Sequence, residues 1–176
     1  MEEPLSSHKL RTHLRPLWLS LAIIVTDQIS KALIVASIPL HSIGAVFLDG
    51  FLRIIHTRNL AIAFSIGRSL SEQVRTVLFI ILPLILLVLI VIYFIKTDDF
   101  TRLQRWAVAG IIGGGFGNMI DRLFRPEGVV DFVDVRFYGL FGLERWPTFN
   151  VADSSVVVAG IVMAASFILE KGEQDE

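Results

Sequence analysis

The stretch VLFIILPLILLVLIVIYFI, residues 77–95, decides the class of this protein. It carries no charged residue, and its length is close to the roughly 20 residues that a helix needs to cross about 30 Å of hydrocarbon. Pro83 lies inside the stretch, which a membrane helix tolerates when a neighbouring helix or a local adjustment satisfies the freed carbonyl group. We therefore predict a membrane-spanning helix over residues 77–95.

The composition of the whole chain agrees with a membrane protein. Its 176 residues are 53% hydrophobic and 19% charged, and the mean hydropathy of +0.66 is too high for a soluble domain that must cover its core with polar surface. The length predicts a single domain over residues 1–176. The absence of cysteine excludes a disulfide scaffold and a thiol nucleophile. A net charge of −1 offers no basic field for nucleic acid, so no nucleic-acid partner is expected.

Three more apolar stretches complete a predicted bundle of four transmembrane helices. The predicted spans are at about residues 17–36, 77–95, 104–120 and 152–169. The first span carries Asp27 and Lys31, which stand four residues apart on one helical face and can pair. The third is rich in glycine, and small pairs such as Gly113 with Gly117 let another helix approach closely. Four spans place both termini on one side, and the lysines outside the spans all lie on that side, which predicts cytoplasmic termini.

Two loops outside the predicted spans are expected to carry structure or function. Residues 37–73 include VFLDGFLRIIHT, two β-prone runs joined by Asp49 and Gly50, a pair suited to a tight hairpin turn. Residues 123–149 form a second long loop without strong structure of its own, and such loops usually serve a function. The predicted fold class is therefore an all-α membrane protein, a four-helix bundle with a small extracytoplasmic β-sheet.

Polar and ionisable residues gather near the ends of the third and fourth spans. Such groups are costly at membrane depth and are functional candidates by default. The third span exits and the fourth span enters on the same side, so these residues are expected near one face of the bilayer. They are Asn118, Asp121, Arg122, Asp131, Asn150 and Asp153.

Most of these residues also have a structural interpretation. Asp153 suits a helix cap, where the helix dipole favours a carboxylate. Asp121 and Arg122 can form an interfacial ion pair, and Asn118 can form a hydrogen bond between helices. Asp131 differs, because it stands in the apolar run GVVDFV, where desolvation favours the neutral carboxyl group and a structural need for a carboxylate is not obvious.

Two carboxylates that share a site cannot both ionise easily. One then holds a proton while the other is charged, and together they can deprotonate a water molecule and protonate a leaving amine. This is the requirement for aspartyl-type peptide hydrolysis. Other hydrolytic schemes fit less well, because the chain has no cysteine and no His-Glu-x-x-His zinc pair. Serine catalysis through Ser154 or Ser155 needs a lysine, and Lys31 stands beside Asp27.

Five motifs, in order along nearly the whole chain, resemble those of the lipoprotein signal peptidases, the signal peptidase II family. They are DQISK at 27–31, RNLAIAF at 58–64, GGFGNMIDR at 114–122, VVDF at 129–132 and FNVAD at 149–153. The resemblance implies a membrane aspartyl endopeptidase of the bacterial inner membrane. Such an enzyme cleaves the signal peptide from diacylglyceryl-modified prolipoproteins, just before the lipidated cysteine.

The resemblance also implies roles for particular residues. Asp131 and Asp153 fall on the catalytic aspartates of the family. Further residues fall on polar positions that support the dyad, line the site or brace the fold: Asn59, Asn118, Asp121, Arg122, Asn150 and Asp27. No metal or organic cofactor is implied, and the outer sheet and residues 123–149 are expected to grip or cover the site. We expect a multi-pass monomer in contact with membrane lipid, with cytoplasmic termini and an active site at the outer face.

Two features depart from the family's usual pattern. Ala61 replaces the glycine of Asn-x-Gly-x-Ala-Phe, which predicts a stiffer or reshaped loop. The stretch LFRPEGVV, residues 123–130, is a residue longer than usual and contains Pro126, so either Asp131 moves or the loop bulges.

Two non-enzymatic interpretations compete with the peptidase. A small transporter whose buried carboxylates relay protons predicts a repeated pattern between the two halves, but the glycine-rich third span has no counterpart in the first. A scaffold whose small-residue faces dimerise treats the acidic residues as caps and leaves Asp131 unexplained.

Overall fold

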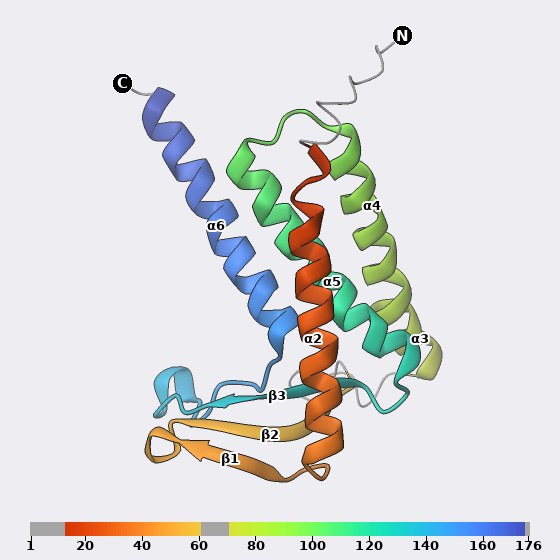
Figure 1. Cartoon of the computed structure of the whole chain (residues 1–176), viewed down its shortest axis with the longest axis vertical. Coiled ribbons are helices and arrows are strands. Elements are labelled where there is room, and N and C mark those ends of the chain that lie inside the picture. Colours follow the sequence, from red (N-terminus) through yellow and green to blue (C-terminus); the bar gives the residue numbers. More distant parts are fainter. Residues whose placement is uncertain (1–12, 61–70, 175–176) are drawn as a thin grey trace.

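In the computed structural model, which describes residues 13–60 and 71–174, long helices stand beside one another and a sheet lies across one end of them (Figure 1). The helices are α2 (Leu17–Ser37), α3 (Glu72–Thr76), α4 (Leu82–Lys96), α5 (Arg102–Phe124) and α6 (Val151–Gln174). The strands are β1 (Ile43–Phe47), β2 (Leu52–Asn59) and β3 (Val129–Val135), and the short 3₁₀ turns are η1 (Leu48–Gly50) and η4 (Leu140–Gly142). α2 begins and α6 ends at the end of the bundle away from the sheet (Figure 1).

Among the described residues, three helices are long and apolar enough to cross a membrane. They are Leu17–Ser37, Glu72–Lys96 and Val151–Glu170. These helices agree with the predicted spans at 17–36, 77–95 and 152–169. The predicted span at 104–120 lies inside α5, which has the length of a span but is less apolar because of its glycines and its charged ends.

The helix that contains Pro83 adjusts its backbone one turn before the proline. Val77–Ile81 form a π-helical turn between α3 and α4, and Pro83 stands in the first turn of α4. Proline has no N–H to donate and its ring crowds the preceding turn, so a wider turn relieves both problems. Of the two ways in which the sequence allows Pro83 to be accommodated, the structure shows a local adjustment of the backbone.

α5 lies among the other long helices, and its glycines let two of them approach closely (Figure 1). A Cβ atom on Gly113 would lie 2.9 Å from the Cα of Ser20 in α2. A Cβ on Gly117 would lie 2.8 Å from the carboxylate of Asp27, also in α2, and 3.0 Å from the Cβ of Ala152 in α6. The close packing predicted for this glycine-rich helix is confirmed.

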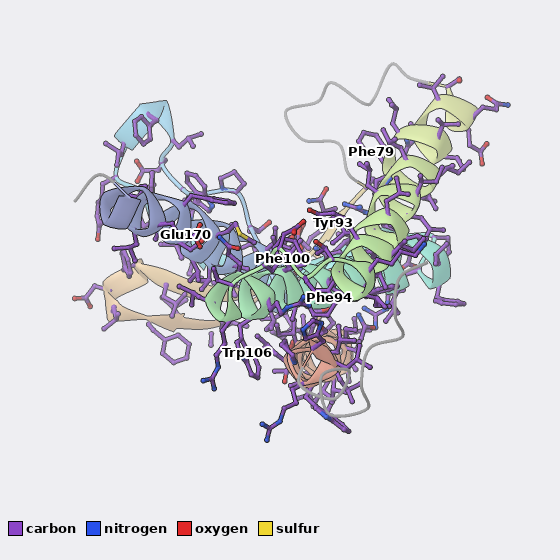
Figure 2. The ribbon with its side chains drawn as sticks, turned by 90° about the horizontal axis from the view of Figure 1, so that it is seen from above. Phe79, Tyr93, Phe94, Phe100, Trp106 and Glu170 are labelled. Atoms are coloured by element: carbon purple, nitrogen blue, oxygen red, sulfur yellow. The ribbon has the colours of Figure 1, made fainter. Side chains whose placement is uncertain are left out.

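The bundle also has an apolar core at the end away from the sheet. Phe94 of α4 is fully buried with Val108 and Ile112 of α5, and Figure 2 shows Phe94 where these helices meet. Gln104 Nε2 donates to Glu170 Oε1 at 2.9 Å, which ties the start of α5 to the end of α6. α5 is therefore fixed to α4 and α6 at this end of the bundle.

The three strands form an antiparallel sheet in the order β1-β2-β3. The predicted hairpin is present, since η1 joins β1 to β2 with Asp49 and Gly50 at φ values of 52° and 86°. The expectation that residues 123–149 lack strong structure is wrong, because β3 and η4 lie within them. β3 pairs with β2, with Thr57 opposite Asp131. The predicted all-α class is therefore incomplete, because the protein is mostly helical but also contains a three-stranded antiparallel sheet.

A cluster of charged residues, called the sheet cluster, joins β2, β3 and the segment after β3. Asp134 is 2% exposed. Arg53 Nη2 lies 2.6 Å from Asp134 Oδ2, and Arg145 Nε lies 2.6 Å from Asp134 Oδ1. The segment then returns beside β3, where Val133 and Phe149 form an isolated bridge. This return places the start of α6 next to β3.

Candidate active site

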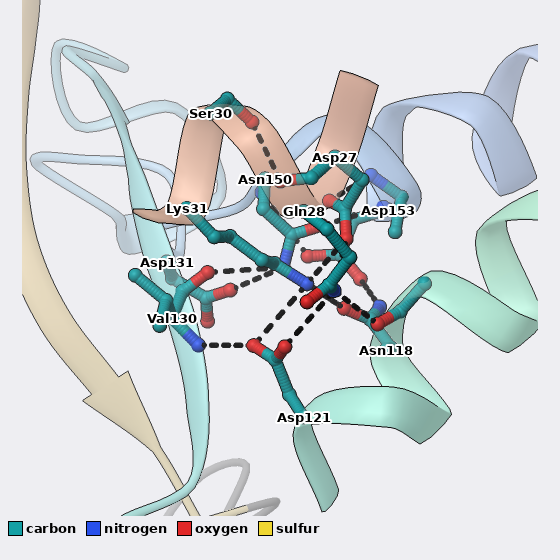
Figure 3. Close-up of polar contacts among 12 residues, drawn as sticks. Asp27, Gln28, Ser30, Lys31, Asn118, Asp121, Val130, Asp131, Asn150 and Asp153 are labelled. Atoms are coloured by element: carbon teal, nitrogen blue, oxygen red, sulfur yellow. Dashed lines mark hydrogen bonds and ion pairs between the residues drawn. The ribbon is translucent and has the colours of Figure 1, made fainter. Parts of the chain in front are cut away.

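Asp131 and Asp153 lie on different elements and are connected through two asparagine side chains (Figure 3). Asn150 Nδ2 donates to Asp131 Oδ1 at 2.7 Å, and Asn118 Nδ2 donates to Asp153 Oδ1 at 2.7 Å. Asn150 Nδ2 also donates to Asn118 Oδ1 at 3.0 Å. One hydrogen-bonded chain therefore links the carboxylates and ties β3, α5 and α6 together.

Asp153 also caps its helix, as the structural interpretation of this residue predicts. The backbone N–H of Asn150 donates to Asp153 Oδ2 at 3.2 Å, and the backbone N–H of Asp153 donates to Asn150 Oδ1 at 2.9 Å. This reciprocal pair is a capping box at the start of α6. It occupies Oδ2, whereas Oδ1 faces Asn118, so the cap orients the carboxylate and leaves one of its oxygens for the polar cluster.

Asp131 is the more deeply buried of the two carboxylates, with 1% of its surface exposed. Burial raises the pKa of its carboxyl group to about 6, and the negative charge of Asp153 acts in the same direction. Hydrogen bonds from Asn59 and Asn150 and the charge of Lys31 lower that pKa. Asn59 Nδ2 donates to Asp131 Oδ2 at 3.0 Å. The carboxyl group of Asp131 therefore keeps its proton to a higher pH than an ordinary aspartate does.

A second group of charged side chains lies next to the two carboxylates. We call it the helix cluster, and it consists of Asp27, Lys31 and Asp121. Lys31 Nζ lies 2.8 Å from Asp27 Oδ2 and 3.3 Å from Asp121 Oδ2, and all three side chains are 0% exposed. Lys31 Nζ also donates to Asn118 Oδ1 at 2.9 Å. The predicted Asp27–Lys31 pair is confirmed, and the structure adds Asp121 of α5 to it.

The helix cluster reaches the backbone beside each of the two candidate catalytic residues. The N–H of Ala152, next to Asp153, donates to Asp27 Oδ1 at 2.9 Å. The N–H of Val130, next to Asp131, donates to Asp121 Oδ2 at 2.9 Å. One lysine thus holds together the two carboxylates that fix the positions of α6 and β3 (Figure 3).

Arg122 does not form the ion pair with Asp121 that the sequence allowed. Among the described residues, Asp121 pairs instead with Lys31 and with Arg125, whose Nη1 lies 3.0 Å from Asp121 Oδ1. Arg122 Nε is buried and has no hydrogen-bond partner in the described part of the chain. Arg122 lines a cavity of about 400 Å³ together with Asn59. Its Nε is thus a buried donor near Asp131 and Asp153 that has no partner among the described residues.

The structure brings together seven of the eight site residues that the sequence suggested, in one connected network, with Arg122 at its edge. The residues of the network are Asp131, Asp153, Asn150, Asn118, Asn59, Asp27 and Asp121. Gln28 and Arg125 belong to the network but were not among the predicted site residues. Gln28 Nε2 donates to Asp27 Oδ2 at 3.2 Å and to Asp121 Oδ1 at 3.0 Å. Arg125 stands four residues after Asp121, a spacing that allows an ion pair on a helix and could have identified it.

Of the two departures from the family pattern, at Ala61 and in residues 123–130, the described residues include only the second. Ala61, with the rest of the 61–64 motif, lies outside the described residues. In the longer stretch, Gly128 has a φ of 101°, and a Cβ there would lie 2.7 Å from the carbonyl oxygen of Asn59. β3 then begins at Val129, opposite Asn59. The turn before β3 therefore depends on glycine at position 128.

Residues 19–169 match the family model described as "Signal peptidase (SPase) II". The chain belongs to the signal peptidase II family. It is 48% identical over 158 residues to the lipoprotein signal peptidase of Treponema pallidum (strain Nichols), covering 90% of this chain and 85% of that one. It is 44% identical over 155 residues to the lipoprotein signal peptidase of Treponema denticola, covering 88% and 89% of the two chains.

The fold agrees with this membership. A solved structure described as a bacterial membrane enzyme, at 2.3 Å resolution, matches with a TM-score of 0.74 and 28% identity over 90% of each chain. The protein is thus a multi-pass enzyme of a bacterial membrane, an aspartic endopeptidase that removes signal peptides from prolipoproteins. The transporter and scaffold interpretations are excluded.

Proposed function

We propose that Asp131 and Asp153 are the catalytic dyad and that the scissile bond is the one just before the diacylglyceryl-modified cysteine of the substrate. The observation that carries this proposal is the hydrogen-bonded chain of Asn150 and Asn118 that joins the two carboxylates. A raised pKa on one carboxyl group beside a second, charged carboxylate is what general acid–base hydrolysis requires.

In the proposed reaction, Asp153 acts first as the base and Asp131 as the acid. Asp153 takes a proton from a water molecule, the hydroxide adds to the scissile carbonyl carbon, and Asp131 protonates the carbonyl oxygen. The carbon–nitrogen bond then breaks, the leaving nitrogen takes the proton from Asp153, and a hydroxyl of the intermediate returns a proton to Asp131. The net change is the addition of one water molecule across the peptide bond.

The surrounding residues are proposed to hold or to complete this arrangement. Asn59 and Asn150 orient Asp131, and Asn118 orients Asp153. The unpartnered Nε of Arg122, at the wall of the cavity, is proposed to donate to a carbonyl oxygen of the substrate. Asp27 and Asp121 are proposed to hold the backbone beside the dyad, because they accept hydrogen bonds from the N–H groups of Ala152 and Val130.

We also propose that α5 crosses the membrane, as a fourth span. Its 23 residues extend about 34 Å as a helix, and the three apolar helices pack around it. An even number of crossings within one domain, residues 1–176, puts both termini on one side of the membrane. The lysines outside the spans favour the cytoplasm for that side, which puts the sheet and the dyad at the outer face. Since one chain supplies the whole network, we propose that the enzyme acts as a monomer.

The test of the dyad is cleavage of a diacylglyceryl-modified prolipoprotein by the purified protein, with Asp131→Asn and Asp153→Asn as the variants. We expect each variant to lose about 10²–10⁴ in kcat, the range of general acid–base catalysis. The control is Asp49→Asn. Asp49 is exposed and has a left-handed backbone conformation, which asparagine adopts readily. Thermal melting checks that the variants are folded. Near-normal turnover in either folded dyad variant overturns the assignment.

A further inference from the structure

The turns η1 and η4 lie together at the end of the sheet that projects past the first turn of α6 (Figure 1). Large apolar side chains of these turns and their neighbours are exposed, and we call them the aromatic edge: Leu48, Phe51, Tyr138, Leu140, Phe141 and Trp146. They come from η1, η4 and their flanking residues. Phe141 is 83% exposed, Leu48 73% and Tyr138 67%. The rings of Phe51 and Tyr138 stack with centroids 6.4 Å apart, so the two turns form one patch.

The backbone of the aromatic edge is strained at the most exposed positions. Leu48, Tyr138 and Phe141 have φ values of 51°, 52° and 55°. A left-handed backbone is unfavourable for bulky side chains, because the Cβ crowds the neighbouring backbone. Glycine or asparagine at these positions would adopt the left-handed backbone with less strain and would expose no large apolar side chain to water. Bulky apolar residues at these sites therefore indicate a partner outside the chain.

The position of the aromatic edge indicates what that partner is. The sheet lies across the end of the membrane helices, and η4 lies on the helix side of β3 (Figure 1). α6, which starts next to β3, exposes a face that includes Val157 at 61%, Val158 at 59% and Ile161 at 64%. In a membrane enzyme, lipid covers this face of α6. The aromatic edge thus lies at the level where the lipid-facing helices end (Figure 1).

The chemistry of the aromatic edge suits the boundary between headgroups and acyl chains. Tryptophan and tyrosine favour this region, because their rings are apolar and carry one polar group. Arg136 stacks its guanidinium over the ring of Tyr138, 5.0 Å from the centroid, and an ion pair with Glu144, Nη2 to Oε1 3.0 Å, holds it there. This polar pair borders the apolar rings, as a group at the headgroup level would.

We propose that the aromatic edge inserts into the headgroup region of the bilayer and anchors the sheet to the membrane surface. The anchor holds β3, and therefore Asp131, at a fixed depth for a substrate that is itself held in the membrane. The proposal rests on the membrane location of the enzyme and does not depend on the assignment of the dyad.

The fluorescence of Trp146 tests the anchor directly. The chain has three tryptophans, so the variant Trp18→Phe/Trp106→Phe leaves Trp146 as the only one. The protein is reconstituted in phosphatidylethanolamine–phosphatidylglycerol vesicles that contain lipids brominated either just below the headgroup or near the bilayer centre. We expect the shallow bromines to quench Trp146 more than the deep ones. Quenching by acrylamide but by neither bromolipid places Trp146 in water and overturns the proposal.

A second variant separates an anchor from internal packing. Phe141→Asn removes the most exposed ring and suits the left-handed backbone. In the Trp146 reporter, we expect it to weaken quenching by shallow bromolipid and to raise KM in vesicles by roughly two- to threefold, with cleavage in detergent unchanged. Asp49→Asn, in the neighbouring turn, is the control and should change neither. Unchanged quenching and an unchanged KM in vesicles for Phe141→Asn contradict the anchor.

Discussion

Two buried ion clusters in the described part of the chain have opposite compositions and different surroundings. The helix cluster places one cation between two carboxylates, and all of its side chains are 0% exposed. The sheet cluster places one carboxylate between two arginines, whose side chains are 29% and 22% exposed. Each cluster joins segments that are far apart in the sequence. Only the helix cluster is completely shielded from water.

This difference in solvation determines what each cluster can tolerate. If the helix cluster loses its cation, two carboxylates remain buried, and breaking a buried pair typically costs about 3–5 kcal/mol. If the sheet cluster loses its carboxylate, the arginines can turn towards water. The carboxylates of the helix cluster also accept hydrogen bonds from the backbone beside both members of the proposed dyad. Damage to the helix cluster is therefore expected to reach catalysis, and damage to the sheet cluster mainly stability.

The largest effect is expected from Lys31→Met. Without the ammonium group, Asp27 and Asp121 repel each other, and the backbone at Ala152 and Val130 shifts with them. We expect kcat to fall by about 100-fold or more and the free energy of unfolding to fall by about 3–5 kcal/mol. Cleavage assays and thermal melting measure both. Lys96→Met, an exposed lysine at the far end of α4, is the control.

Adding a second change sharpens this prediction. Asp27→Asn removes the carboxylate that loses its ion pair with Lys31, whereas Asp121 keeps its pair with Arg125. The side-chain oxygen of the asparagine can still accept from the N–H of Ala152. The double variant Asp27→Asn/Lys31→Met should therefore melt at a higher temperature than Lys31→Met alone. A double variant that melts no higher than the single variant would show that charge is not the reason for the loss.

A smaller effect is expected from crowding the helix cluster. Gly117→Ala places a methyl group 2.8 Å from Asp27 Oδ2. We expect overpacking to lower the free energy of unfolding by about 1–3 kcal/mol, with a fall in kcat because Asp27 moves. The matched control is Gly160→Ala in α6, where a Cβ meets nothing within 4 Å. Equal behaviour of the two alanine variants, in melting and in cleavage, contradicts the argument.

The smallest effect on catalysis is expected from Asp134→Asn in the sheet cluster. It should lower the free energy of unfolding by about 1–3 kcal/mol, because the charge-assisted bonds of both arginines are weakened. Turnover should stay within a fewfold of the wild type, measured with the same lipidated substrate. A loss of kcat as large as that of Lys31→Met would contradict the comparison between the clusters.

Much of the fold could be predicted because it depends on local pattern. Hydropathy over a window identifies the apolar helices, and glycine spacing identifies the close packing of α5. β3 could not be predicted, because its existence depends on pairing with β2, which places Thr57 opposite Asp131. The sheet cluster depends on the same register and was therefore also missed.

The candidate site could be predicted only in part for the same reason. The pair of Asp27 and Lys31 lies one helical turn apart, so spacing alone suggested it. The contact of Lys31 with Asp121 joins two helices and depends on how closely they pack at Gly117. The capping role of Asp153 was anticipated from its position, but its link to Asp131 runs through Asn118 and Asn150, which only the folded chain brings together.

The most direct test of the shared-proton dyad is the pH dependence of kcat/KM in the wild type and in Asn59→Ala. The pKa of Asp131 is raised to about 6, and the proposed active form keeps that proton, so kcat/KM should fall as the pH rises through about 6. The hydrogen bond from Asn59 lowers that pKa, so Asn59→Ala should move the decline to higher pH. A decline at the same pH in both proteins, or at lower pH in Asn59→Ala, would contradict the account.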